Sequence, residues 1–106
     1  VSLGMVDGTT LILPYVDEKV GTRISISVPA ADIILAVRRP EGISARNVLE
    51  ARIEGIHALG TGILVYARIN ELWLVEITPD ALTDLDLYEG QKVYLVIKSS
   101  SIIPLH

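Results

Sequence analysis

The sequence predicts an all-β fold with one short helix. Half of its 106 residues are hydrophobic and none is Phe. Ile, Val and Leu dominate, and no helical period persists for long, which together favour strands. Several short runs alternate apolar and polar side chains, and Gly, Pro and Asn separate them, as in strands joined by tight turns.

The N-terminal segment, residues 1–41, contains three predicted strands. An Asp-Gly turn signal precedes residues 9–13, which form an edge strand that ends at a proline. Residues 23–28 alternate as in a strand with one buried face. Residues 32–37 are nearly all apolar, which predicts a strand covered on both faces. We expect this segment to complete or flank a barrel.

The second segment, residues 42–106, continues the strand pattern. Residues 47–56 alternate between an apolar face and a charged face. Two more strands, 63–69 and 72–77, are joined by a tight hairpin in which Asn70 is expected to be left-handed.

A short helix is predicted from Pro79 to Leu85. Thr78 suits the N-cap, proline suits the first helical position, and Asp80 suits the positive end of the helix dipole. An apolar strand over residues 91–97 follows. Short strands with one small helix are typical of an OB-like β-barrel.

Composition excludes several functional classes. The formal charge is −4 and the pI is near 5.0, the opposite of the basic surface that binds nucleic-acid backbones. The five aromatic residues are not interleaved with basic ones, so we expect no nucleic acid as a partner. The absence of cysteine excludes disulfides and thiolate metal sites.

The chain is expected to lie in the cytoplasm and to be part of a larger protein. No secretion signal is visible, and the apolar runs are too short to span a bilayer. The first residue is not Met, which indicates a fragment or a processed product. No phosphate-binding loop is present, so we expect no ATP hydrolysis by these residues.

The segment Ser44-Ala45-Arg46-Asn47 is the first candidate site. It places a hydroxyl, a guanidinium and a carboxamide directly before the strand at 47–56, and Gly42 allows close backbone approach. Arginine offers a fixed fork of donors, so a tetrahedral dianion can be held without a metal. Alternatively, the segment is an ordinary loop-to-strand junction whose polar groups bond local backbone.

Lys98, Ser99 and Ser100 form the second candidate segment. They follow an apolar strand and place hydroxyl donors beside an ammonium group, which suits the other half of an oxyanion site. Alternatively, they form a polar strand end with the lysine in water.

These motifs carry a resemblance to a known family. Ser44–Asn47 and the Val-Leu-Glu-Ala-Arg-Ile run after it resemble the opening of the molybdate-binding Mop domains, also grouped as TOBE domains. A second family signature, a strand ending in Ile-Lys-small-Ser, is matched by Ile97–Ser100. It is preceded, as in the family, by a Thr-Pro helix start and a Leu-x-x-Gly turn. The segment at 20–42 resembles the tail of a molybdate transporter ATPase.

The resemblance implies a molybdate or tungstate oxyanion bound at a subunit interface, without any organic cofactor or further metal. Family sites form where the Ser-Ala-Arg-Asn segment of one subunit or repeat faces the Lys-Ser segment of another. Carried over, the oxyanion site comprises Ser44, Ala45, Arg46 and Asn47 with Lys98, Ser99 and Ser100. Ser99 stands where Ala is frequent, so either of the two serines is a candidate donor.

The resemblance also implies a biological setting. The chain is expected to be the cytoplasmic regulatory domain of a molybdate importer ATPase and to form a homodimer. Its other partners are an upstream ATPase domain and membrane permease subunits at the inner face of the membrane. Two alternatives remain open: a structural dimerisation module that has lost anion binding, and a free-standing molybdate storage protein.

Enzymatic functions are disfavoured. His57 has no nucleophile near it in sequence and His106 is terminal, so neither suggests a catalytic triad. The carboxylates of residues 80–89 lack the spacing of a calcium loop, and helix capping and solubility explain them. We therefore expect a binding domain without a catalytic site.

Overall fold

The computed structural model describes residues 2–6, 9–13, 25–45 and 47–105. The sequence-predicted turn at residues 7–8 lies outside this part of the chain. The described elements are mostly strands: β1 (Ser2–Val6), β2 (Thr9–Leu13), β3 (Ser25–Ser27), β4 (Ile34–Ala36), β5 (Asn47–Leu59), β6 (Gly62–Arg68), β7 (Leu72–Ile77), β8 (Lys92–Ile97) and β9 (Ile103–Leu105). One α-helix, α1 (Pro79–Asp84), and two 3-10 turns, η1 (Ala30–Asp32) and η2 (Ser99–Ser101), complete them. No helix in the described ranges is long and apolar enough to cross a membrane.

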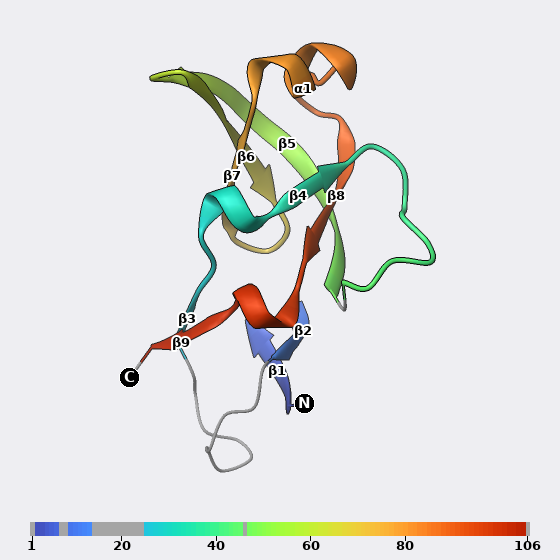
Figure 1. Ribbon diagram of the computed structural model, residues 1–106, viewed down its shortest axis with the longest axis vertical. Helices are drawn as coiled ribbons and strands as arrows, with labels where there is room; N and C mark the ends of the chain where they lie inside the picture. Colours follow the sequence, from blue (N-terminus) through green and yellow to red (C-terminus); the bar gives the residue numbers. More distant parts are fainter. Residues whose placement is uncertain (1, 7–8, 14–24, 46, 106) are drawn as a thin grey trace.

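Five strands form the main antiparallel sheet, in the order β4-β8-β5-β6-β7. The sheet curls until η1 and β4 lie against β7, so that the two edges approach each other (Figure 1). The predicted all-β, OB-like barrel with one short helix is confirmed.

The long strand β5 joins the two halves of the barrel. Its first half pairs with β8, from Asn47 opposite Ile97 to Arg52 opposite Lys92. Its second half pairs with β6, and the register shifts between Ile53 and Gly55. A bulge of this kind bends a strand and increases its twist. β5 therefore pairs with β8 along one edge and with β6 along the other.

Alternation along β5 and its neighbours produces the core. Apolar side chains of β5 point inward up to Ile53, and the charged ones point outward, as the sequence predicted. After the bulge, the alternation of inward and outward side chains shifts by one residue, so Ile56 packs against the core. The buried cluster comprises Ile33, Leu35, Ala51, Ile53, Ile63, Val65, Ala67, Val75, Val93, Leu95, Ile97 and Ile102.

Helix α1 begins as the sequence predicted. The Thr78 hydroxyl oxygen accepts a hydrogen bond from the Ala81 N–H at 3.2 Å, and proline occupies the first turn. The helix ends one residue earlier than predicted, because Leu85 is the C-cap. Asp86 then adopts a positive φ of 51°, which turns the chain towards β8.

Two details of the sequence prediction are wrong. β4 is not covered on both faces, because Ile34 is 61% exposed while Ile33 and Leu35 on either side are buried. The apolar run therefore belongs to a one-sided strand at the sheet edge. Asn70 is not left-handed, since Asp86 is the only non-glycine residue with positive φ in the described ranges. The three-residue turn after β6 is closed instead by the Ile69 N–H, which donates to the Glu71 carbonyl at 3.0 Å.

Two small sheets lie at the end of the barrel opposite α1 (Figure 1). β1 and β2 form a hairpin, and β3 pairs with β9. The hairpin strand β2 contacts η2, directly after β8. The division into residues 1–41 and 42–106 stays a prediction, although β4 from the first segment pairs with β8 from the second.

The buried position of Leu95 predicts a large effect on stability. Leu95 is fully buried, whereas Leu74 in the edge strand β7 is 43% exposed. We expect Leu95→Ala to lower the free energy of unfolding by about 2–5 kcal/mol, because it leaves a cavity. Leu74→Ala should cost about 1 kcal/mol or less, because much of the side chain is already in water. Urea denaturation measures both changes. Equal losses of unfolding free energy in the two variants would contradict the assignment of Leu95 to the core.

Candidate functional site

The pairing of β5 with β8 brings the two candidate segments to the same end of the barrel. Asn47, the first residue of β5, lies opposite Ile97, the last residue of β8. Arg46 directly precedes the first and Lys98 directly follows the second in the chain. Segments distant in sequence therefore adjoin within a single copy of the chain, at the end that faces the small sheets (Figure 1).

The first segment approaches β5 through an open loop. Gly42 has a φ of +64°, a conformation that glycine adopts without steric cost. Ser44 is exposed and Ala45 is half-buried. Arg46, the predicted main charge partner of the anion, lies outside the described residues.

Asn47 differs from its neighbours because it is buried, with 4% of its surface exposed. It is the only polar residue among the buried ones in the described part of the chain. Every buried side-chain nitrogen and oxygen atom in the described ranges has a hydrogen-bond partner. The Asn47 side chain is therefore part of the packed interior.

The second segment is a polar turn anchored by an apolar residue. Lys98 and Ser100 are exposed and Ser99 is half-buried. The turn η2 is closed by the Ser101 N–H, which donates to the Lys98 carbonyl at 2.9 Å. Ile102 follows and is 2% exposed. This burial anchors the turn, while Lys98 and Ser100 stay exposed.

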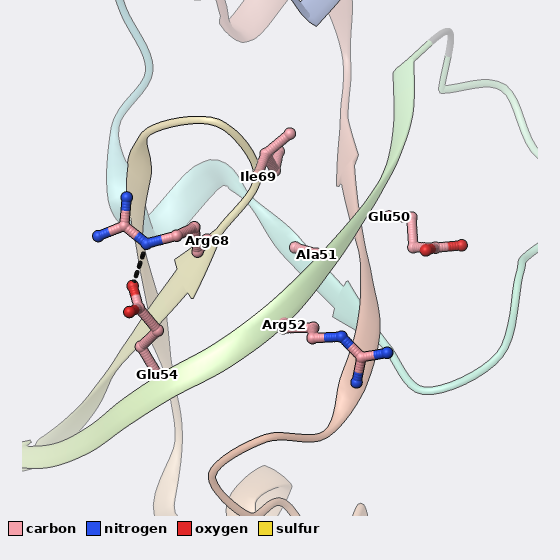
Figure 2. A pocket seen from close by; sticks show the side chains of 6 residues that line it. All are labelled: Glu50, Ala51, Arg52, Glu54, Arg68 and Ile69. Atoms are coloured by element: carbon pink, nitrogen blue, oxygen red, sulfur yellow. Dashed lines mark hydrogen bonds and ion pairs between the residues drawn. The ribbon is translucent and has the colours of Figure 1, made fainter.

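A hollow of about 470 Å³ lies elsewhere, in the middle of the sheet. Its lining residues are Glu50, Ala51, Arg52, Glu54, Arg68 and Ile69 (Figure 2). Arg68 forms an ion pair with Glu54, and Arg52 donates to the Gly90 carbonyl at 3.1 Å. The hollow contains none of the predicted oxyanion donors.

Three basic side chains form a transverse row on the outer face of the sheet. Arg52 lies opposite Lys92 on β8 and opposite Arg68 on β6. Directly opposed like charges repel each other, and the Glu54 carboxylate offsets part of this repulsion. Sequence reasoning missed this row because it depends on which strands are neighbours. The charged face of residues 47–56 was the only available signal.

The remaining titratable side chains give no sign of a metal centre. The described residues contain no group of three or more His, Asp or Glu placed to hold a metal ion. His57 packs edge-to-face against Tyr66, with ring centroids 5.0 Å apart. Gly55 makes room for the two rings, because a Cβ there would lie 3.1 Å from His57 Nε2 and 3.2 Å from Tyr66 Cδ2.

The ion pair in the hollow is expected to contribute little to stability. The Arg68 and Glu54 side chains are 48% and 46% exposed, so water screens their attraction. A double-mutant cycle of Glu54→Ala and Arg68→Ala should give a coupling energy below about 1 kcal/mol. A coupling of several kcal/mol in urea denaturation would show that this hollow is a tightly structured site.

Comparison with known proteins places the chain in a family. The TOBE domain model matches residues 43–104, more than half of the chain. The chain is 36% identical over 85 residues to the molybdenum import ATP-binding protein ModC of Rhizobium johnstonii, covering 77% of this chain and 24% of that protein. The ModC protein of Vibrio parahaemolyticus is 36% identical over 101 residues, covering 88% of this chain and 27% of that protein. The chain thus spans about a quarter of the length of these relatives.

A solved structure supports the fold. The cytoplasmic molybdate-binding protein ModG, crystallised with molybdate bound, superposes with a TM-score of 0.70. The match covers 76% of this chain and 60% of ModG, at 24% sequence identity. The family model and the barrel agree with each other, and the chain belongs to the TOBE domain family.

Proposed function

We propose that this chain binds molybdate, or the similar anion tungstate, at the end of the barrel where β5 begins and β8 ends. The observation that carries the proposal is the pairing of Asn47 with Ile97, which makes the two candidate segments neighbours. The names of the relatives, molybdenum import proteins and a molybdate-binding protein, favour this anion.

The chemistry of the donors fits a tetrahedral dianion. Arg46 and Lys98 supply two positive charges, and the hydroxyls of Ser44 and of Ser99 or Ser100 supply short donors. Ser44, Lys98 and Ser100 are exposed, so an anion can reach them. The overall charge of −4 repels anions at long range, and binding therefore depends on this local group of donors. Selectivity over sulfate arises from size, because both anions carry the same charge and only the larger one reaches every donor.

A second copy of the chain completes the site in this proposal. Ser44, Lys98 and Ser100 are exposed at the end of the barrel in the single chain. Exposed apolar side chains adjoin both segments: Ile43 precedes Ser44, and Ile103 lies just beyond η2. Contact between two copies there would bury these side chains and shield the anion from water. Light scattering should find a dimer at micromolar concentration, and a monomer with and without molybdate would contradict this arrangement.

The proposed role is regulatory and non-catalytic. The relatives are ATP-binding import proteins of which the chain matches about a quarter. We place the chain in the cytoplasm, beside an ATPase domain and the permease subunits of a molybdate importer. Molybdate binding there would signal to the transporter how much molybdate the cytoplasm already contains.

Truncation of Lys98 provides the first test. Lys92, at the other end of the same strand, is a matched control because it is also exposed. A charge-assisted hydrogen bond is worth about 1.5–3 kcal/mol, so Lys98→Ala should weaken molybdate binding roughly tenfold to a hundredfold. Lys92→Ala should leave the affinity unchanged. Calorimetric titration with molybdate, and with sulfate for comparison, measures the effect.

Truncation of Arg46 provides the second test. Arg46→Ala should weaken binding at least as much as Lys98→Ala, because no neighbour replaces the planar fork of a guanidinium. Arg38→Ala, in the loop before the motif, is the control. Equal affinities of these two arginine variants would refute the site assignment. A parent chain that does not bind molybdate would favour the structural dimerisation module.

A further inference from the structure

We infer that the first half of β5 has an open edge, and that a second copy of the chain pairs with it there as an added strand. β5 pairs with β8 from Asn47 to Arg52, but with β6 only from Arg52 onward. In the described part of the chain, residues 47–51 therefore have no strand on the β6 side. The inference rests on the dimer of the proposed function and specifies its contact, but it does not depend on molybdate.

The hydrogen bonds of Ile53 show which backbone groups face the open edge. Its N–H donates to the Gln91 carbonyl at 3.0 Å and its C=O accepts from the Gly90 N–H at 2.7 Å, both directly before β8. Successive residues of a strand direct these groups to opposite sides. The N–H and C=O groups of Val48 and Glu50 therefore point away from β8. Within the described ranges, no hydrogen bond uses these groups.

The hollow in the middle of the sheet lies where β6 ends beside β5. Arg52 and Arg68 are the terminal pair of the ladder between these strands, and both line the hollow with Glu50, Ala51 and Ile69 (Figure 2). Its volume of about 470 Å³ thus adjoins the unpaired stretch of β5. Glu50 is itself exposed. A strand edge with unused backbone groups and space beside it accepts another strand.

Two copies of this edge are complementary to each other. A two-fold axis at Leu49 places Val48 opposite Glu50 of the second copy, and symmetry generates the reverse pair. Both residues direct their N–H and C=O groups to the open side, so the members of each pair exchange hydrogen bonds in both directions. A contact that uses the same surface on both copies closes as a dimer.

Side chains favour the register centred on Leu49 over the adjacent ones. Leu49 packs against the core of its own copy but is only half-buried, and its symmetry mate would cover it further. A register centred on Glu50 would place two carboxylates directly opposite each other, which is destabilising. A register centred on Val48 would set Glu50 opposite a residue that precedes β5. Only the register at Leu49 pairs both open residues within the strand.

A cysteine at position 49 tests the contact directly. Across a non-hydrogen-bonded antiparallel pair the Cα atoms lie about 4.5 Å apart, within the range of about 4.4–6.8 Å that a disulfide spans. The chain contains no cysteine, so a disulfide of Leu49→Cys can only join two copies. We expect most of the oxidised protein to run as a covalent dimer on a non-reducing gel. The control, Leu74→Cys on β7, replaces a side chain that is 43% exposed and should stay largely monomeric.

Glu50→Pro removes hydrogen bonds of the contact and leaves the β5–β8 ladder intact. Proline is tolerated in a strand where its missing N–H faces the open edge. The variant should raise the dissociation constant of the dimer roughly tenfold to a hundredfold, because each copy loses one donor to the other. Glu50→Ala keeps the N–H and should match the parent. Sedimentation over a concentration series measures both constants, and circular dichroism checks that both variants are folded.

The outcomes separate this contact from the anion site. The inference is overturned by a monomeric parent, by equal cross-linking of the two cysteine variants, or by a folded Glu50→Pro variant with the parental dissociation constant. If the parent still dimerises and binds molybdate in the last two cases, the proposed function stands and the copies meet elsewhere. A specific Leu49→Cys cross-link in a chain that does not bind molybdate would support the contact and refute the proposed function. If Glu50→Pro does not fold, the cysteine variants decide.

Discussion

The pairing between β5 and β8 is the interaction on which the rest of the structure depends. It aligns residues 47–52 with residues 92–97 in one antiparallel ladder. Its inward side chains, among them Ala51, Val93 and Leu95, lie at the centre of the buried cluster. The first polar segment leads into one end of this ladder, and the second polar segment follows it at the same end. Core packing and the geometry of the candidate site are therefore fixed by the same register.

Local patterns predicted the elements well, because each pattern has a local cause. Alternation marked β5 up to Ile53, and the Thr78-Pro79 pair marked the start of α1. The features that the sequence did not predict depend on contacts between distant segments. The shift in register between Ile53 and Gly55 follows from the pairing with β6. The exposure of Ile34 follows from the place of β4 at the sheet edge.

The candidate site shows the same division between local and distant causes. The sequence predicts the hydrogen-bonding chemistry of its residues, because serine, arginine and lysine are donors wherever they lie. Accessibility is different, since Asn47 is buried where its strand pairs with β8, a strand far from it in the chain, while Ser44 stays exposed. The row formed by Arg52, Arg68 and Lys92 likewise exists only once three strands are neighbours.

The place of β4 has a consequence for the modular character of this fold. The family match begins at residue 43, yet β4 (Ile34–Ala36) covers an edge of β8 in the same sheet. A chain that started at the motif would leave the N–H and C=O groups along that edge unpaired. Such an edge accepts a strand from another molecule. The family model therefore covers less of the chain than the strands that pair in this sheet, and a cut between β4 and the motif favours domain-swapped assembly.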